Sequence, residues 1–156
     1  MGPLDFDAAF SAAGALAMAG WASMILLPRW RSLSRRLAGL VIPTILSLGY
    51  VVLVAVHWHG ASGGFGSLDQ VAALFGSRPL LLAGWVHYLA FDLLVGSWIL
   101  RRSQAEAVPH GLVVPVLLLT FLFGPLGYLA YVWLEASIRA AREDRIARLQ
   151  ARLPAW

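Results

Sequence analysis

Four long apolar segments determine what this sequence can fold into, because each is long enough to cross a lipid bilayer as a helix. They lie at about 6–27, 38–58, 80–100 and 110–134, close to the roughly 20 residues that about 30 Å of hydrocarbon require. Hydrophobic residues make up 60% of the 156 positions and charged residues only 13%, a composition far from that of soluble domains. We therefore predict an all-α integral membrane protein, a bundle of four transmembrane helices in a single domain over residues 1–156.

Two further helical segments are expected outside the four spans. Between the second and third spans, Ser67 is placed to cap a short helix, and Gly76 with Pro79 to end it. This pattern predicts a short interfacial helix, with a plain surface connector as the alternative. After the fourth span, residues 135–156 carry apolar side chains among arginines at helical spacing, which predicts an interfacial or solvated helical extension.

The distribution of arginine predicts how the chain is oriented. All 12 basic residues are arginine, which suggests a GC-rich bacterial gene and hence the bacterial inner membrane. Arginines gather in residues 29–36, after the first span, and at 101–102, after the third, so these loops are predicted to be cytoplasmic and the amino terminus external. Further arginines follow the fourth span, where a four-span chain would place them on the opposite side. We read the net charge of +4 as a topology signal and expect the lipid bilayer, not nucleic acid, as the partner.

Several catalytic classes lack their defining residues. The sequence has no cysteine, which excludes disulfides, thiolate nucleophiles and cysteine metal sites. It also has no Walker loop, no G-x-S-x-G elbow and no H-E-x-x-H motif. Any chemistry therefore has to rest on other polar residues inside the spans.

An aspartate in the third span is the most informative of these residues. Asp92 lies about 18 Å along the helix axis from the start of the span, near the bilayer midplane. A charge there costs on the order of 3 kcal/mol even on insertion scales, so the presence of an aspartate at this depth requires an explanation. Two interpretations stay open: a neutral structural acid that hydrogen-bonds across helices, or a catalytic acid that gives and takes a proton.

Helical phase gives Asp92 and a nearby histidine different surroundings. Trp85, Tyr88, Asp92 and Gly96 share one stripe of the third span, and Gly96 is expected to leave a hollow beside the carboxyl group. His87 precedes Asp92 by five residues, which is about 140° around a helix. Either His87 faces a second helix, or one pocket wraps around the span and receives both groups.

The other histidines lie near the ends of spans. His57 and His59 follow the second span and are predicted to be interfacial anchors. His110 opens the fourth span, about 10 Å in depth from Asp92. Histidines from two helices can ligate a haem iron, but His87 and His57 differ in depth. We expect no metal and no cofactor, and keep haem as the alternative.

Prolines interrupt two of the spans. Pro43 lies in the second span, and Pro115 and Pro125 lie in the fourth, where each removes a helical hydrogen bond. The stretch "FGPLG", residues 123–127, also sets two glycines around Pro125. This combination predicts a kink in the fourth span.

Three ordered stretches resemble a known family of membrane proteins. "LVIPTILSLGYVVLVAVHW", "RPLLLAGWVHYLAFDLLVGSWI" and "PHGLVVPVLLLTFLFGPLG" are similar to the abscisic-acid-deficient-four-like proteins, whose plant members are plastid proteins needed for neoxanthin synthesis. The similarity runs from about Leu27 to Ala136. It implies four spans and, for plant members, conversion of an epoxidised xanthophyll into an allenic one. Ser97 and Tyr131 stand where plant members have arginine and histidine, so a different carotenoid or related isoprenoid is implied here.

The resemblance also implies which residues form the site. The positions that match the family pattern are Pro43, Gly49, Tyr50, Trp85, His87, Asp92, Leu93, His110, Gly124, Pro125 and Gly127. The predicted catalytic residues are Asp92, His87 and His110, and the predicted substrate-binding residues are Trp85, Tyr88, Phe91, Gly96, Tyr50 and Pro125. In this hypothesis Asp92 donates a proton to an epoxide or polyene carbon and His87 removes one elsewhere, while aromatic rings stabilise the cationic polyene.

Two functions from different classes stay open. The first is a bacterial homologue of the plant neoxanthin-synthesis protein, a cofactor-independent isomerase that rearranges a carotenoid or related isoprenoid dissolved in the bilayer. The second is a non-catalytic membrane protein that binds a polyene or haem, or supports a partner enzyme. Asparagine in place of Asp92 would abolish turnover in the first case and be tolerated in the second. The sequence leaves the oligomeric state open.

Overall fold

The computed structural model describes residues 5–27 and 30–151, which form helices and short connections and contain no β-strand. In chain order the elements are α1 (Phe6–Leu26), α2 (Arg31–Arg36), a π-helical stretch (Leu37–Val41), α3 (Ile42–His57), a 3₁₀ turn (Trp58–Gly60), α4 (Leu68–Phe75), α5 (Arg78–Ala105) and α6 (His110–Gln150). Within these described residues, four helical segments are long and apolar enough to cross a membrane: Phe6–Leu26, Ser32–Gly60, Arg78–Ala105 and His110–Gln150. The predicted all-α class and its four apolar helices are confirmed.

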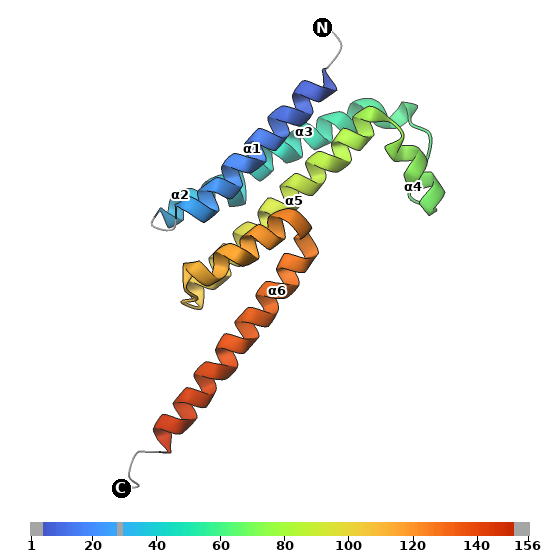
Figure 1. Cartoon of the computed structure of the whole chain (residues 1–156). Helices are drawn as coiled ribbons and strands as arrows, with labels where there is room; N and C mark the ends of the chain where they lie inside the picture. The colour runs from blue at the N-terminus through green and yellow to red at the C-terminus, as the bar shows by residue number, and fades with distance from the viewer. Residues whose placement is uncertain (1–4, 28–29, 152–156) are drawn as a thin grey trace. The chain divides into compact units, whose positions relative to one another are not determined.

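The chain forms two compact units, residues 1–97 and 98–156, and α5 continues through both. In the first unit, α1, α3 and the first part of α5 lie side by side (Figure 1). Small residues allow the close approach: a Cβ atom added to Gly20 of α1 would lie 2.8 Å from Leu93 Cδ2 of α5 and 3.3 Å from Ile42 Cδ1 of α3. Such packing of small residues replaces hydrophobic collapse as the main attraction between helices in lipid.

Local signals in the sequence set where the helices begin. Asp5 caps α1, because its Oδ1 atom accepts hydrogen bonds from the backbone N–H groups of Asp7 and Ala8 at 3.0 and 3.1 Å. Ser67 caps α4 in the same way, with its Oγ atom 3.2 Å from the backbone nitrogen of Gln70, as predicted. Before Pro43, the helix of the second span contains the π-helical stretch Leu37–Val41. The predicted interruption of this span by proline takes the form of this π-helical stretch.

In the second unit, α6 is broken at Phe123, whose backbone angles of φ −143° and ψ 46° are not helical. The kink predicted at "FGPLG" is therefore confirmed, and the helix is interrupted there instead of only bent. A Cβ atom on Gly127 would overlap the backbone of Thr120, although seven residues of straight helix span about 10 Å. The chain reverses here, and α6 consists of a first arm, residues 110–122, and a second arm, residues 124–150, that folds back along it (Figure 1).

Candidate functional site

Asp92 lies in the part of α5 that belongs to the first unit, and its surroundings set it apart from the other acidic residues there. Only 9% of its surface is exposed. It shares a side-chain hydrogen bond with Tyr88, one helical turn earlier. Its Oδ2 atom is buried and has no hydrogen-bond partner among the residues that the structure describes. A buried polar atom without a partner is rare in native proteins and calls for an explanation.

A row of aromatic rings leads away from this carboxyl group. The Tyr88 ring lies 5.4 Å from the Trp85 indole, measured between centroids, and the indole lies 5.5 Å from the Phe10 ring of α1. Trp85 and Phe10 are both exposed at the surface of the chain. The row therefore connects the carboxyl group with the surface that α1 and α5 present together.

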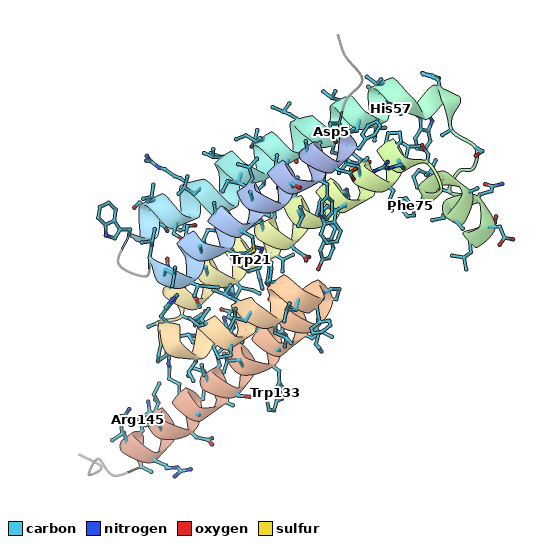
Figure 2. All side chains as sticks on the ribbon, turned by 45° about the horizontal axis from the view of Figure 1, so that its top comes forward. Asp5, Trp21, His57, Phe75, Trp133 and Arg145 are labelled. Carbon is cyan, nitrogen blue, oxygen red and sulfur yellow. The ribbon has the colours of Figure 1, made fainter. Side chains whose placement is uncertain are left out.

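An open groove continues this row toward the start of α1. It has a volume of about 280 Å³ and is lined by Phe6, Asp7, Phe10, Arg78, Leu81, Leu82 and Trp85. Its polar wall is the ion pair between Arg78 Nη2 and Asp7 Oδ1, which are 2.8 Å apart. The labelled Asp5 and His57 mark the same end of the unit in Figure 2, where the ring of His57 also contacts Phe6 at 5.9 Å. The groove is thus apolar along its length and charged at one end.

His87 faces a different neighbour, as helical phase predicts. Its imidazole stacks on Phe91 with a centroid distance of 4.4 Å and an interplanar angle of 19°. It also lies 5.5 Å from the ring of Tyr50 in α3. His87, Phe91 and Tyr50 therefore form one cluster toward α3, while Asp92, Tyr88 and Trp85 form another toward α1. Between the two arrangements that the sequence left open, the structure shows His87 turned toward a second helix.

The hollow expected beside Gly96 is not present, and this prediction was wrong. A Cβ atom at Gly96 would lie 2.7 Å from Cη2 of Trp21 and 3.0 Å from Cε of Met24, both in α1. The Trp21 indole (Figure 2) fills the space that the glycine leaves. Sequence alone gave no sign of this, because Gly96 and Trp21 are 75 positions apart. Gly96 permits close packing of α1 on α5.

The other histidines and the predicted site residue Pro125 lie elsewhere. His57 forms a 2.9 Å hydrogen bond between Nδ1 and the backbone oxygen of Leu53, so it is held at the end of α3. His59 is exposed in the turn that follows. His110 begins α6 and Pro125 follows its break, so both belong to the second unit. Among the described residues, no group of three or more histidine and carboxylate side chains is arranged to hold a metal ion.

The second unit contains a buried carboxylate that the sequence analysis did not single out. Glu135 is 8% exposed, and its Oε1 atom accepts hydrogen bonds from Arg102 Nε at 2.8 Å and from Arg139 Nη2 at 2.7 Å. Arg139 also pairs with Glu106 at 2.6 Å. The four-residue spacing of Glu135 and Arg139 was the available signal. This carboxylate is a structural charge, satisfied by two guanidinium groups.

Comparison with known proteins identifies the family. The model of the ABA DEFICIENT 4-like family matches residues 8–131, which include most of α1, all of α3, α4 and α5, and the break in α6. No curated protein and no solved structure matches the chain significantly. The matched segment covers most of the sequence and contains both Asp92 and His87. The chain therefore belongs to the ABA DEFICIENT 4-like family.

Proposed function

We propose that the protein is a cofactor-independent isomerase that rearranges a carotenoid or related isoprenoid dissolved in the bilayer. Membership of the family supports a role related to the plant neoxanthin-synthesis protein. The observation that carries the proposal is the buried, unpartnered Oδ2 atom of Asp92 among the described residues, at the end of an aromatic row that opens onto an apolar groove. The aromatic and aliphatic lining of this groove suits an apolar polyene.

The chemistry is a redox-neutral transfer of protons. Asp92, protonated in its buried site, donates a proton to an epoxide oxygen or to a polyene carbon. Protonation of the epoxide oxygen breaks its C–O bond, whereas protonation of a polyene carbon breaks the C=C π bond. The positive charge that develops on the polyene is stabilised by the faces of Trp85 and Tyr88. The Asp92 carboxylate then removes a proton from a neighbouring carbon, which forms the new double bond and restores the acid. No electron acceptor and no co-substrate is consumed.

Tyr88 is the residue that this scheme needs beside the acid. Its hydroxyl shares a hydrogen bond with Asp92, which fixes the carboxyl group while Oδ2 keeps no partner among the described residues. His87, which the sequence predicts as the base, takes no part in this scheme, because its ring is stacked on Phe91 toward α3; its role stays a prediction. The role of His110 also stays a prediction.

The test is conversion of pigment by the purified protein. Reconstituted protein is incubated with epoxidised and non-epoxidised carotenoids, and the products are separated by chromatography and identified by their absorption spectra. We expect a new isomer from the wild type and from the exposed-site control Asp69→Asn. Turnover should fall by about 10²-fold to 10⁴-fold in Asp92→Asn, the usual range for a lost general acid. Full turnover in Asp92→Asn would sink the proposal.

A binding function without chemistry is the second candidate, and a separate groove favours it. This groove has a volume of about 420 Å³, and its lining is almost wholly apolar: Ala9, Ala12, Ala13, Leu16, Ile45, Leu46, Leu48, Gly49, Val52, Leu53, Leu82 and Val86. It suits an acyl or polyene chain and offers no group for acid or base catalysis. The absorption spectrum of the purified protein separates the ligands, because a carotenoid gives a vibronic triplet and haem gives a Soret band. Pigment that is retained but never converted favours this second function.

The proposed setting is the bacterial inner membrane, with an external amino terminus. The arginines of the loop after α1 and at the end of α5 support this orientation through the positive-inside rule. The substrate would enter sideways from the lipid, since the groove between α1 and α5 is open at the surface of the chain.

A further inference from the structure

The direction of the second arm of α6 can be read from its contacts with the end of α5. Trp98 contacts Tyr131, Arg102 pairs with Glu135 and Glu106 pairs with Arg139. Each pair is separated by the same 33 positions. A constant difference in residue number means that the two helices run parallel, whereas antiparallel helices would keep a constant sum. The second arm therefore leaves in the same direction as the end of α5.

The first arm of α6 runs antiparallel to the end of α5. Only the connection between Ala105 and His110 separates it from the end of α5, and so short a connection makes neighbouring helices antiparallel. The reversal occurs at Phe123, where Gly127 returns to the backbone of Thr120. The two arms are therefore a helical hairpin with both open ends on the side where α5 ends.

The dimensions of the hairpin indicate that it does not cross the membrane. The first arm has residues 110–122, about 20 Å of helix, which is well short of the roughly 30 Å hydrocarbon core. Its tip is apolar: Leu122, Phe123 and Leu126 are all more than half exposed. The turn side of the hairpin is closed, because Thr120, Gly124 and Gly127 are buried and Thr120 Oγ1 donates to the Val116 oxygen at 2.8 Å. Irregular backbone at membrane depth requires such internal packing.

The arginines give an independent argument for the same topology. If α6 crossed the membrane once, six arginines would lie on each side, since those of the tail would join Arg78. If α6 is a hairpin, 11 of the 12 lie on one side, and only Arg78, which pairs with Asp7, lies on the other. The second distribution is the one that the positive-inside rule favours.

We propose that α6 is a re-entrant hairpin that enters and leaves the bilayer on the same, cytoplasmic face. The protein then has three crossing segments, α1, the α2–α3 segment and α5, and its tail lies at the membrane face that also carries the loop after α1. The ion pairs of Glu135 and Glu106 with Arg102 and Arg139 hold the returning arm at this face. The tail arginines, which a four-span topology places outside, become part of the cytoplasmic surface.

The absence of native cysteine makes this topology directly testable. Single cysteines are introduced at three exposed positions of the full chain: Ser62→Cys before α4, Ala105→Cys at the end of α5 and Ala147→Cys in the tail. Each is treated in intact spheroplasts, and again after permeabilisation, with a maleimide that cannot cross membranes. Labelling after permeabilisation serves as the control for each site.

The hairpin predicts that positions 105 and 147 share one pattern of maleimide labelling and that position 62 shows the opposite pattern. With an external amino terminus, Ser62→Cys is labelled in intact spheroplasts, while Ala105→Cys and Ala147→Cys react only after permeabilisation. Labelling of Ala147→Cys together with Ser62→Cys, and apart from Ala105→Cys, would overturn the proposal. The comparison does not depend on the absolute orientation, because only the shared pattern is decisive.

Discussion

The two units each contain one buried carboxylate, and the two carboxylates are treated in opposite ways. Asp92 is 9% exposed and Glu135 is 8% exposed, so burial does not distinguish them. Glu135 accepts hydrogen bonds from two arginines, whereas Asp92 shares one with Tyr88 and leaves Oδ2 without a partner among the described residues. Burial alone therefore does not identify a functional carboxylate. A carboxylate fully satisfied by cations stabilises the fold, while an incompletely satisfied one is available for chemistry.

The largest expected effect concerns the turn of α6 at Phe123, which lies in the same unit as Glu135. Gly127→Ala should destabilise the protein by about 3 kcal/mol or more, because the new Cβ atom overlaps the backbone of Thr120, which cannot move aside as a side chain can. Thermal unfolding in detergent, followed by tryptophan fluorescence, measures this change. Gly111→Ala in the same helix is the control, since nothing lies within 4 Å of its added Cβ atom. Equal stability of the two variants would show that the reversal at Phe123 is not a tight turn.

The next effect tests Glu135 as a structural charge. Glu135→Ala should lower the free energy of unfolding by on the order of 2 kcal/mol, because two arginines lose their shared acceptor. Glu143→Ala, at an exposed position of the same arm, should change it little. Chemical denaturation in mixed micelles compares the two variants. If Glu135→Ala is as stable as Glu143→Ala, the ion-pair cluster does not support the fold.

A smaller effect is expected from the residue that orients Asp92. Tyr88→Phe removes the hydroxyl that bonds the carboxyl group, so pigment turnover should fall by about 10-fold while the ring contact with Trp85 is kept. Tyr128→Phe, in the second unit, provides the control. Unchanged turnover in Tyr88→Phe would mean that the hydrogen bond does not position the acid.

The smallest effect is the stability of Asp92→Asn. Asparagine keeps nearly the same shape and can still hydrogen-bond to Tyr88, so the free energy of unfolding should stay within about 1 kcal/mol of the wild type. A loss as large as that of Glu135→Ala would assign Asp92 a structural role. The thermal unfolding assay used for Gly127→Ala applies here without change.

Much of the fold is local and could be predicted from the sequence. Long apolar runs specify the helices, Ser67 specifies the start of α4, and the glycines around Pro125 specify a break. The reversal at that break could not be predicted. It is visible only in contacts between α5 and the second arm of α6, such as the ion pair of Arg102 with Glu135. Sequence shows a kink, and only tertiary contacts show its angle.

The candidate site likewise has one feature that the sequence predicts and one that it does not. The separation of His87 from Asp92 follows from helical phase alone, and the structure agrees with it. The filling of the Gly96 space by Trp21 depends on how two distant helices meet, so the glycine was read as a hollow. Local geometry is encoded in short spacings, whereas the occupant of a space on a helix face is set by its neighbour.

The most direct test of the contrast between the two carboxylates is a comparison of turnover in two conservative variants. Asp92→Asn and Glu135→Gln are purified, reconstituted at equal amounts of folded protein, and assayed for conversion of the carotenoid that the wild type accepts. We expect Asp92→Asn to lose about 10²-fold or more of the rate, and Glu135→Gln to retain the rate of the wild type. Equal rates in the two variants, or a loss confined to Glu135→Gln, would contradict the assignment of Asp92 as the catalytic acid.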